Sequence, residues 1–465
     1  MAEPATGKRT SLQGLWSSRL AFVLAVAGSA VGLGNIWKFP YTAGDNGGGA
    51  FVLIYLVCVV AVGLPIMMAE VLLGRRGRRN PVDTMRILGE EEANTAVWRL
   101  VGLMGVGGGF LILSFYSVVA GWALDYIVKG FSGAFNAKSA EEIASMFQAL
   151  TGSWVRLGFW HTLFMVMTVW VVARGVERGL EQAVRILMPA LLILMLVLVG
   201  YSITQGHFMQ GVHFLFDPDF SKVTPDVVLV ALGQAFFTLS IGMGAVMAYG
   251  AYLPEGTSIV GTTLAVVIAD TVIALLAGLA IFPIVFAYGL QPAQEEGLLF
   301  MVLPVAFGQM PAGSVFGTLF FVLLAFAAWT SSIGLIEPAV AYLTERKGMT
   351  RRTAAWAVGG IIWALGFATI LSFNVLSDVT FWRGTLFDNL IHLTSNIMLP
   401  LGGLLIAVFA GWIMCRNSSA EELDMGTGTL YQTWRFLARY VAPVAVILIL
   451  LNFATGGWVT RLLGG

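Results

Sequence analysis

The sequence predicts an all-α protein that crosses a lipid bilayer many times. Of its 465 residues, 58% are hydrophobic and 11% are charged, and the mean hydropathy of +0.83 is far above that of soluble domains. Apolar stretches long enough to span a bilayer recur along the whole chain. Two of these stretches, five spans apart, are interrupted at mid-length by glycines and polar residues. Such a matched pair of broken helices is the pattern expected of a membrane fold built from two inverted repeats.

Hydropathy averaged over about 19 residues predicts about eleven spans. They are expected at roughly 19–43, 48–75, 98–130, 158–173, 178–203, 226–253, 258–289, 314–345, 352–372, 385–415 and 434–459. Residues 19–203 would form the first repeat and 226–415 the second, with 434–459 appended. The segment 291–313 contains too many Pro, Gly and Glu residues to span, so we expect an outer lid there.

The distribution of cationic residues predicts the orientation. With eleven spans, the main clusters all fall on one side, and they include Arg75, Arg76, Arg174, Arg178, Arg346, Lys347, Arg416, Arg435 and Arg439. The opposite side carries only scattered cations such as Lys129 and Arg383. The positive-inside rule therefore places residues 1–18 and the clusters in the cytoplasm and the C-terminus outside.

Other classes of function find no support in the composition. The net charge is zero and the cations are spread over short loops, so no nucleic-acid partner is expected. The four histidines lack the spacing of metal ligands, and no nucleophile motif or phosphate-binding loop occurs, so no enzyme activity is expected. Cys58 and Cys415 are not placed to form an extracellular disulfide and are expected to be free thiols.

The first interruption lies in the run from Ala27 to Pro40. Glycine costs about 1 kcal/mol and proline about 3 kcal/mol relative to alanine inside a helix, so unwinding is expected there. Carbonyls released around Gly28, Ala30 and Val31 could ligate a hard cation, and Asn35 adds a side-chain oxygen. The amides of Leu33 and Gly34 could bind an anionic group at the start of the second half-helix. Alternatively, Gly28 and Gly32 merely allow close helix packing.

The sixth span repeats this anomaly between Gln234 and Gly244, and three further spans carry polar groups that need an explanation. Asp270 favours a cation site, because an ionised carboxylate in a membrane needs a partner; the alternative is a protonated or hydrogen-bonded structural residue. Ala327, Thr330 and Ser331 offer only oxygen ligands, as Na⁺ prefers, although hydroxyls also bond back to their own helix. Tyr116 needs a partner for its hydroxyl, either a substrate carboxylate or a neighbouring helix.

Several of these runs closely resemble the neurotransmitter:sodium symporter family. The matching motifs are Trp16–Leu20, Gly32–Pro40 (GLGNIWKFP), Asn46–Phe51, Arg174–Glu181 (RGVERGLE), Gln234–Ser240 (QAFFTLS) and Thr330–Ser332. The resemblance extends from about residue 16 to the last span. It implies the five-plus-five inverted-repeat (LeuT-type) fold, with helices 1 and 6 unwound at mid-membrane, and sodium-driven transport by alternating access.

The resemblance also implies a central substrate site and two sodium sites. The first sodium site would comprise the Ala30 carbonyl, Asn35, Thr238 and Asp270, completed by the substrate carboxylate. The second would comprise the carbonyls of Gly28, Val31 and Ala327 and the hydroxyls of Thr330 and Ser331. The substrate carboxylate would meet the Leu33 and Gly34 amides and the Tyr116 hydroxyl, and its ammonium would meet Ala30, Phe237, Thr238 and Ser240.

The chain departs from the family pattern around the expected chloride site. The family usually has Asn where this chain has Asp270, and the chloride-coordinating Ser of animal members aligns with Ala274. The other chloride ligands are matched by Tyr55, Gln234 and Thr238. Our hypothesis is that the Asp270 carboxylate supplies the missing negative charge, which would make transport chloride-independent and sensitive to protons.

The two gates of the family also differ here. The outer gate pairs an Arg with an acidic residue; the corresponding positions hold Lys38 and His392, and Asp388, one turn before His392, is our choice of partner on charge. The acidic member of the inner gate maps to Glu345. Its N-terminal basic partner aligns near Gln13, so Lys8 or Arg9 is the candidate substitute.

The expected substrate is a neutral hydrophobic L-amino acid, including aromatic ones. Gly32 stands where monoamine transporters carry an Asp, which favours an amino acid. The side-chain subsite would be lined by Ile112, Phe237, Met243 and Leu335, among which a charged side chain would have no partner. Glycine, another small zwitterion, or a non-transporting amino-acid sensor are the alternatives. We expect a monomer or weak homo-oligomer in a prokaryotic inner membrane.

Overall fold

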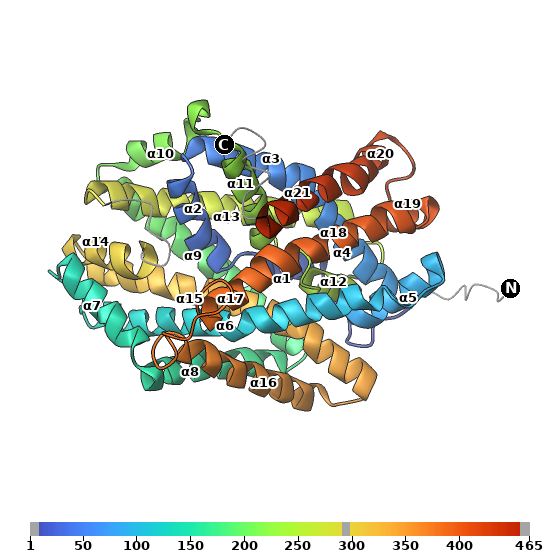
Figure 1. The fold of residues 1–465 in the computed structure, drawn as a ribbon, viewed down its shortest axis with the longest axis horizontal. Helices are drawn as coiled ribbons and strands as arrows, with labels where there is room; N and C mark the ends of the chain where they lie inside the picture. The colour runs from blue at the N-terminus through green and yellow to red at the C-terminus, as the bar shows by residue number, and fades with distance from the viewer. Residues whose placement is uncertain (1–8, 291–297, 456–465) are drawn as a thin grey trace.

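The computed structural model describes residues 9–290 and 298–455 and confirms the all-α prediction. Within these ranges, extended backbone pairs only as the isolated bridges Gly48–Pro218 and Phe381–Gly384. Long helices run side by side along the longest axis of the molecule, and short helices gather at its two ends (Figure 1). α7, α10 and α14 lie at one end, and α5, α19 and α20 lie at the other.

The first half of the chain supplies the helices up to α9. They are α1 (Arg19–Ala30), α2 (Phe39–Asp45), α3 (Gly49–Cys58), α4 (Leu64–Gly77), α5 (Pro81–Ala93), α6 (Arg99–Phe131), α7 (Ala140–Thr151), α8 (Trp154–Val172) and α9 (Gln182–Ile203). The π-helical turns Gly34–Lys38, Val59–Gly63 and Val176–Glu181 continue directly into α2, α4 and α9.

The second half supplies the remaining helices. They are α10 (Phe208–Phe216), α11 (Pro225–Thr238), α12 (Ala245–Ala251), α13 (Ile259–Ala287), α14 (Leu303–Gln309), α15 (Gly313–Lys347), α16 (Arg351–Leu371), α17 (Leu386–Ile391), α18 (Leu399–Val408), α19 (Arg416–Leu423), α20 (Thr429–Phe436) and α21 (Ala442–Ala454). The π-helical turns His392–Met398, Phe409–Ile413 and Leu437–Val441 extend α17, α18 and α20.

Short local signals set where these helices begin. The Ser18 side chain accepts a hydrogen bond from the Ala21 amide at the start of α1, and Thr224 caps α11 through the Val227 amide. Asn80 accepts from the amides of Val82 and Asp83 and is followed by a proline at the first position of α5. These helix starts therefore follow from local signals in the sequence.

The predicted set of spans is present, with two of them broken. In the described ranges, nine continuous helices are long and apolar enough to cross a membrane, and the pair Arg19–Ala30 and Gly34–Asp45, bent by 54°, makes a tenth. The predicted span 226–253 consists of α11 and α12, which have 14 and 7 residues and are each too short to span alone. The breaks lie between α1 and the turn Gly34–Lys38, and between α11 and α12.

Two predicted segments fall partly outside the described residues. Of the lid expected at 291–313, residues 291–297 are not described; the remainder forms the π-helical turn Leu298–Val302 and α14, which pack against α7 and α15 respectively. The span expected at 434–459 begins earlier, at Thr429, and its last residues, 456–459, lie beyond the described part.

α4 and α12 interlock through their backbones. A Cβ atom placed on Gly74 would lie 2.0 Å from the Met247 carbonyl oxygen, and one placed on Gly250 would lie 2.8 Å from the Val71 carbonyl oxygen. Each helix therefore presents a glycine to a carbonyl of the other. This contact holds the second half of the broken sixth span against α4.

We expect Gly74→Ala to destabilise the protein, because its new methyl group meets backbone that cannot rotate away. Overpacking of this kind costs about 1–3 kcal/mol. Gly200→Ala is the matched control, since a Cβ atom there meets no atom within 4 Å. Thermal unfolding of the detergent-purified variants measures the difference, and equal midpoints for the two would contradict this account of the contact.

Candidate functional site

At the first break, side chains replace the helical partners of the backbone. Val31 leaves the helix with φ −69° and ψ 99°. The Gly32 amide then donates to Asn35 Oδ1 at 3.1 Å, and the Leu33 amide donates to the Tyr116 hydroxyl at 3.3 Å. The backbone released at this depth is therefore satisfied by side chains, as it must be where water is excluded.

The second break is fixed by backbone that L-residues rarely adopt. Ser240, Gly242 and Gly244 have φ of 53°, 83° and 73°. Position 242 also requires glycine because a Cβ atom would lie 2.5 Å from the Leu399 carbonyl oxygen. The Ser240 hydroxyl donates to the Ser29 carbonyl at 3.1 Å, which ties the second break to the first.

The residues predicted for the first sodium site meet in one buried cluster. The Asn35 amide nitrogen donates to Asp270 Oδ1 at 2.8 Å and to the Asp270 carbonyl at 3.1 Å. The Thr238 hydroxyl donates to Asp270 Oδ2 at 3.0 Å. These three side chains are at most 1% exposed. A carboxylate, an amide oxygen and a hydroxyl suit a hard cation, so the residues fit sodium.

The residues predicted for the second sodium site also come together. The Ser331 hydroxyl lies 3.4 Å from the Gly28 carbonyl and 3.2 Å from the Val31 carbonyl, and donates toward them. The Thr330 hydroxyl lies 3.0 Å from the Ala327 carbonyl. This cluster joins α15 to the end of α1 and offers only oxygen atoms, which again fits a hard monovalent cation.

Two glycines bring the first break close to its neighbours. A Cβ atom on Gly32 would lie 2.4 Å from the Ser331 hydroxyl oxygen and 2.8 Å from the Tyr116 hydroxyl oxygen, and one on Gly34 would lie 3.0 Å from the Phe237 ring. A side chain at position 32 would fill the space beside both hydroxyls. The remaining predicted pocket residues, Ile112, Met243 and Leu335, are all buried in the same hydrophobic cluster.

The structure does not bring together the residues predicted for the outer gate. The Lys38 ammonium lies 4.1 Å from the centroid of the Phe237 ring, and no ion pair between described residues joins it to an acid. Asp388 is exposed and its Oδ2 accepts from the Thr385 amide and hydroxyl, both at 2.8 Å, as a helix cap. The expected Lys38–Asp388 contact is therefore replaced by a cation–π contact, because Asp388 is held at the start of α17.

His392 takes no part in the outer gate in this structure. Its ring packs at 4.7 Å against Trp382, and its Nδ1 lies 2.9 Å from the Asn396 amide nitrogen. His392 therefore helps to hold the loop before α17 rather than facing Lys38.

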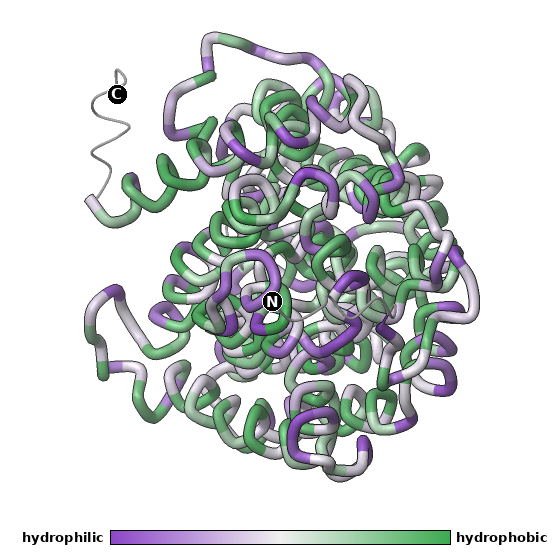
Figure 2. Tube along the Cα trace, turned by 90° about the vertical axis from the view of Figure 1, so that its right-hand side faces the viewer, coloured by the Kyte–Doolittle hydropathy of each residue, from purple (hydrophilic) through white to green (hydrophobic). Residues whose placement is uncertain are grey.

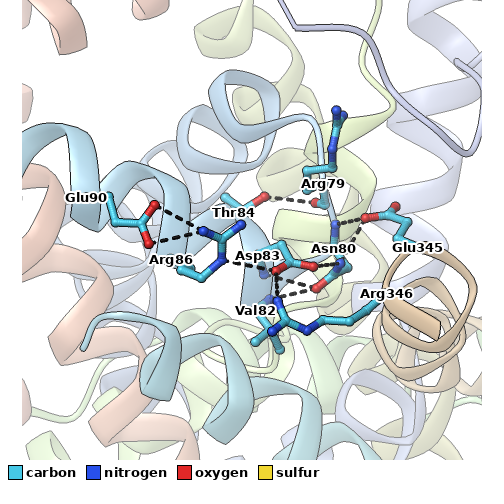
Figure 3. A network of polar contacts seen from close by, with 9 residues as sticks. All are labelled: Arg79, Asn80, Val82, Asp83, Thr84, Arg86, Glu90, Glu345 and Arg346. Atoms are coloured by element: carbon cyan, nitrogen blue, oxygen red, sulfur yellow. Dashed lines mark hydrogen bonds and ion pairs between the residues drawn. The ribbon is translucent and has the colours of Figure 1, made fainter. Parts of the chain in front are cut away.

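Glu345, predicted for the inner gate, has a neutral partner. Its Oε2 accepts from the Asn80 backbone amide at 2.7 Å and from the Asn80 side chain at 2.9 Å (Figure 3). Arg9 instead pairs with Glu91 and donates to the Arg76 carbonyl, and Lys8 lies outside the described residues. The suggested Arg9–Glu345 contact is thus not formed. Asn80, three residues after the end of α4, was not identifiable from sequence as the partner.

Asp83 forms the neighbouring half of the same network (Figure 3). Arg346 donates to its Oδ1 at 2.8 Å, and Asn80 donates to its Oδ2 at 2.9 Å. Burial alone would raise the pKa of this carboxyl group, but the hydrogen bonds from Asn80, Arg346 and Arg86 outweigh burial and hold the pKa below its ordinary value. The carboxylate thus stays ionised and ties α5 to the end of α15.

Two fully buried carboxylates were missed by the sequence analysis. Glu70 is fully buried on α4, and its Oε2 accepts from the Gly242 amide at 3.1 Å, which stabilises the second break. Glu337 is fully buried on α15, where it accepts from Arg351 at 3.0 Å and from the Tyr252 hydroxyl at 2.8 Å. The signal available for both was an acidic residue inside an otherwise apolar span, the same signal that identified Asp270.

The N-terminal segment closes the same end of the molecule. Trp16 is 2% exposed; its indole donates to the Tyr249 carbonyl at 3.1 Å and its amide donates to the Tyr252 carbonyl at 2.9 Å. The Ser17 amide donates to Glu181 at 3.0 Å. Trp16 therefore covers α12 and the residue after it through Tyr249 and Tyr252. Tyr252 in turn donates to Glu337, which pairs with Arg351.

Comparisons with known proteins agree with this geometry. The model of the sodium:neurotransmitter symporter family matches residues 13–144 and 152–456. The uncharacterized sodium-dependent transporter YhdH of Bacillus subtilis (strain 168) is 40% identical over 440 residues, which are 94% of this chain and 97% of the relative. An uncharacterized sodium-dependent transporter of Haemophilus influenzae is 34% identical over 444 residues, with the same shares covered. The crystal structure of MhsT in complex with L-phenylalanine superposes with a TM-score of 0.87 at 42% identity, covering 95% of this chain and 99% of that one.

We expect Arg351→Gln to lower the free energy of unfolding strongly, because it leaves the Glu337 carboxylate buried without its cation. Breaking a buried pair from one side costs about 3–5 kcal/mol. Arg352→Gln, at the exposed next position, is the matched control. Thermal unfolding and limited proteolysis after Arg9 compare the variants, and equal stability would show that the pair contributes little.

Proposed function

The chain belongs to the sodium:neurotransmitter symporter family, and we propose that it imports neutral hydrophobic L-amino acids, aromatic ones included, in symport with sodium. The family and its LeuT-type fold are those of sodium-coupled secondary transporters, not of enzymes. The observation that carries the proposal is the joining of the two helix breaks to two clusters of oxygen ligands. Cation binding and closure of the broken helices would then be one event.

Two sodium sites are proposed at these clusters. The first would use Asn35, Thr238 and Asp270, with the Ala30 carbonyl at the end of α1. The second would use the Ser331 and Thr330 hydroxyls with the carbonyls of Gly28, Val31 and Ala327. Sodium would supply the positive charge that pulls these carbonyls together, because both clusters link elements that the breaks allow to move separately.

An amino acid is proposed as the substrate because hydrogen-bond donors for a carboxylate and acceptors for an ammonium group lie between the two clusters. The Leu33 and Gly34 amides and the Tyr116 hydroxyl would hold its carboxylate, while carbonyls of Ala30, Phe237 and Thr238 and the Ser240 side chain would hold its ammonium group. Gly32 leaves room for that carboxylate beside Tyr116. A hydrophobic side chain would enter the cluster of Ile112, Met243 and Leu335. The bound L-phenylalanine of MhsT, a 42% identical protein, is consistent with this class.

Chloride independence is proposed from the charge at position 270. The Asp270 carboxylate is fully buried beside Asn35 and Thr238, and no cation of the described residues forms an ion pair with it. Ala274 lacks a hydroxyl, and the buried Tyr55 hydroxyl has no hydrogen-bond partner in the described part. A fixed carboxylate would therefore take the role that a bound anion plays elsewhere.

The proposed orientation places the end with α5, α19 and α20 in the cytoplasm of a prokaryotic cell and the end with α7, α10 and α14 outside (Figure 1). Figure 2 looks onto the first of these ends, where hydrophilic chain segments surround the N-terminal region. The arginine clusters at this end support the assignment through the positive-inside rule. A monomer or weak homo-oligomer in the inner membrane is proposed with it.

Uptake by proteoliposomes tests the proposal. With an inward sodium gradient and gluconate in place of chloride, we expect accumulation of radiolabelled leucine-like and aromatic L-amino acids that collapses when the sodium gradient is removed. Accumulation of only glycine or another small zwitterion would contradict a hydrophobic substrate and show that the substrate is a small zwitterion. Binding without any accumulation would contradict symport and favour an amino-acid sensor.

We expect the double variant Asp270→Asn with Ala274→Ser to need chloride for transport. Asp270→Asn removes the fixed charge, and Ala274→Ser supplies a hydroxyl ligand for chloride. The double variant is expected to lose most uptake in gluconate and to regain it in chloride. Ala274→Ser alone is the control and should transport in both buffers. Chloride-free uptake by the double variant equal to that of the parent would refute the role of Asp270.

A further inference from the structure

A basic pocket lies away from the transport pathway, between α19, α20 and the turn Leu437–Val441. It has a volume of about 480 Å³ and is lined by Arg416, Arg435 and Arg439 together with the aromatic rings of Tyr431, Phe436 and Tyr440. α19 and α20 lie side by side at the end of the molecule that carries α5 (Figure 1). Nothing in the proposed transport cycle uses this pocket.

The three guanidinium groups are not neutralised by the protein. Among the ion pairs of residues 9–290 and 298–455, none involves Arg416, Arg435 or Arg439. Arg435 donates to the Tyr431 hydroxyl at 2.7 Å and to the Ser419 hydroxyl at 3.3 Å. The Nε of Arg439 is buried and has no hydrogen-bond partner in the described part of the chain. The pocket thus holds three like charges and unused donors.

Several other arginines at this end of the molecule form ion pairs with carboxylates. Arg75 pairs with Glu422, Arg346 with Asp83 and Arg351 with Glu337. Each of these cations has a carboxylate from another element. Arg416, Arg435 and Arg439 line one pocket without such a partner, and like charges gathered in one pocket are unfavourable unless an anion joins them.

The surroundings of the pocket are those of a membrane interface. The Arg439 guanidinium stacks 3.9 Å from the centroid of the Trp412 ring, and Trp412, Tyr440 and Phe436 are 48%, 45% and 56% exposed. Tryptophan and tyrosine gather at the level of lipid headgroups. The arginine groups are therefore placed at headgroup depth rather than in bulk water.

An apolar stripe leads from the pocket toward the bilayer centre. Counting from Phe436 and Tyr440, the exposed residues Val444, Ile447, Leu448 and Leu451 follow at helical spacing along α21. A single helix face thus joins a cationic, aromatic headgroup site to a surface that suits an acyl chain. A free phosphate ion would use only the first part of this arrangement.

We infer that this pocket binds the phosphodiester headgroup of an anionic phospholipid, with an acyl chain along α21. Guanidinium groups bind phosphate oxygens through paired hydrogen bonds, and basic pockets between membrane helices are suited to such headgroups. The bound lipid would neutralise the cluster and fix α20 and α19 at the membrane surface. In the proposed orientation this lipid belongs to the cytoplasmic leaflet.

Native mass spectrometry of the full chain, titrated with phosphatidylglycerol or phosphatidylcholine in detergent, tests this inference. We expect phosphatidylglycerol to bind more tightly, and each arginine removed to weaken it about fivefold, so that Arg416→Gln with Arg439→Gln loses about 25-fold. Arg416→Lys with Arg439→Lys keeps the charge and should retain most of the binding. Arg174→Gln, which removes a single arginine stacked on Trp170, is the control and should bind like the parent.

The remaining outcomes are decisive as well. Thermal unfolding shows whether the double variant is folded. If it is not, Arg416→Gln alone serves for the test, because Arg416 is exposed. Equal binding of the two lipids by the parent, or unchanged phosphatidylglycerol binding by Arg416→Gln, would overturn the inference. Complete displacement of phosphatidylglycerol by millimolar inorganic phosphate would show a phosphate site without a role for α21, which also overturns it.

Discussion

Backbone polar groups cannot be left unpaired inside a membrane, and the structure depends on how this constraint is met where two helices break. The amides and carbonyls released at the breaks are taken up by a few buried side chains: Asn35, Tyr116, Ser331, Ser240 and Glu70. Each of them comes from a different place in the sequence, and together they hold α1, α4, α6, α12 and α15 around one centre. Asn35 and Ser331 also belong to the two oxygen clusters that fit sodium, so part of the network that stabilises the breaks is also part of the proposed sodium sites.

The parts of the molecule predicted from sequence are those with a local or periodic signal. Hydropathy identified the spans, glycines and polar residues identified both breaks, and Asp270 stood out because its span contains no other charged residue. Contacts between distant segments left no such signal. Three such contacts depend on the rotation and tilt of the packed helices. They are the contacts of Asn80 with Glu345, of Lys38 with Phe237 and of Arg351 with Glu337. Charge alone suggested Asp388 and Arg9 as partners, but Asp388 caps its own helix and Arg9 has a nearer acid in Glu91.

Polar contacts of unequal strength hold the end of the molecule that carries α5. Trp16 donates to two backbone carbonyls and packs on the rings of Tyr249 and Tyr252. Glu345 binds a neutral asparagine, whereas Glu337 and Arg351 form a buried charged pair. Opening this end would expose the first two contacts to water at little cost, since water can replace neutral hydrogen bonds. The charged pair joins α15 to α16, and Arg351 also donates to the Gln13 side chain of the N-terminal segment at 3.2 Å. The basic pocket between α19 and α20 shares no residue with these three contacts.

The reciprocal glycine contact between α4 and α12 has a mechanical consequence. Because a carbonyl of each helix sits in the notch left by a glycine of the other, one helix cannot slide along its neighbour without lifting out of both notches. The two helices therefore resist sliding and would move together. A movement of the second half of the sixth span would carry with it α4, which ends just before Arg78 and Arg79.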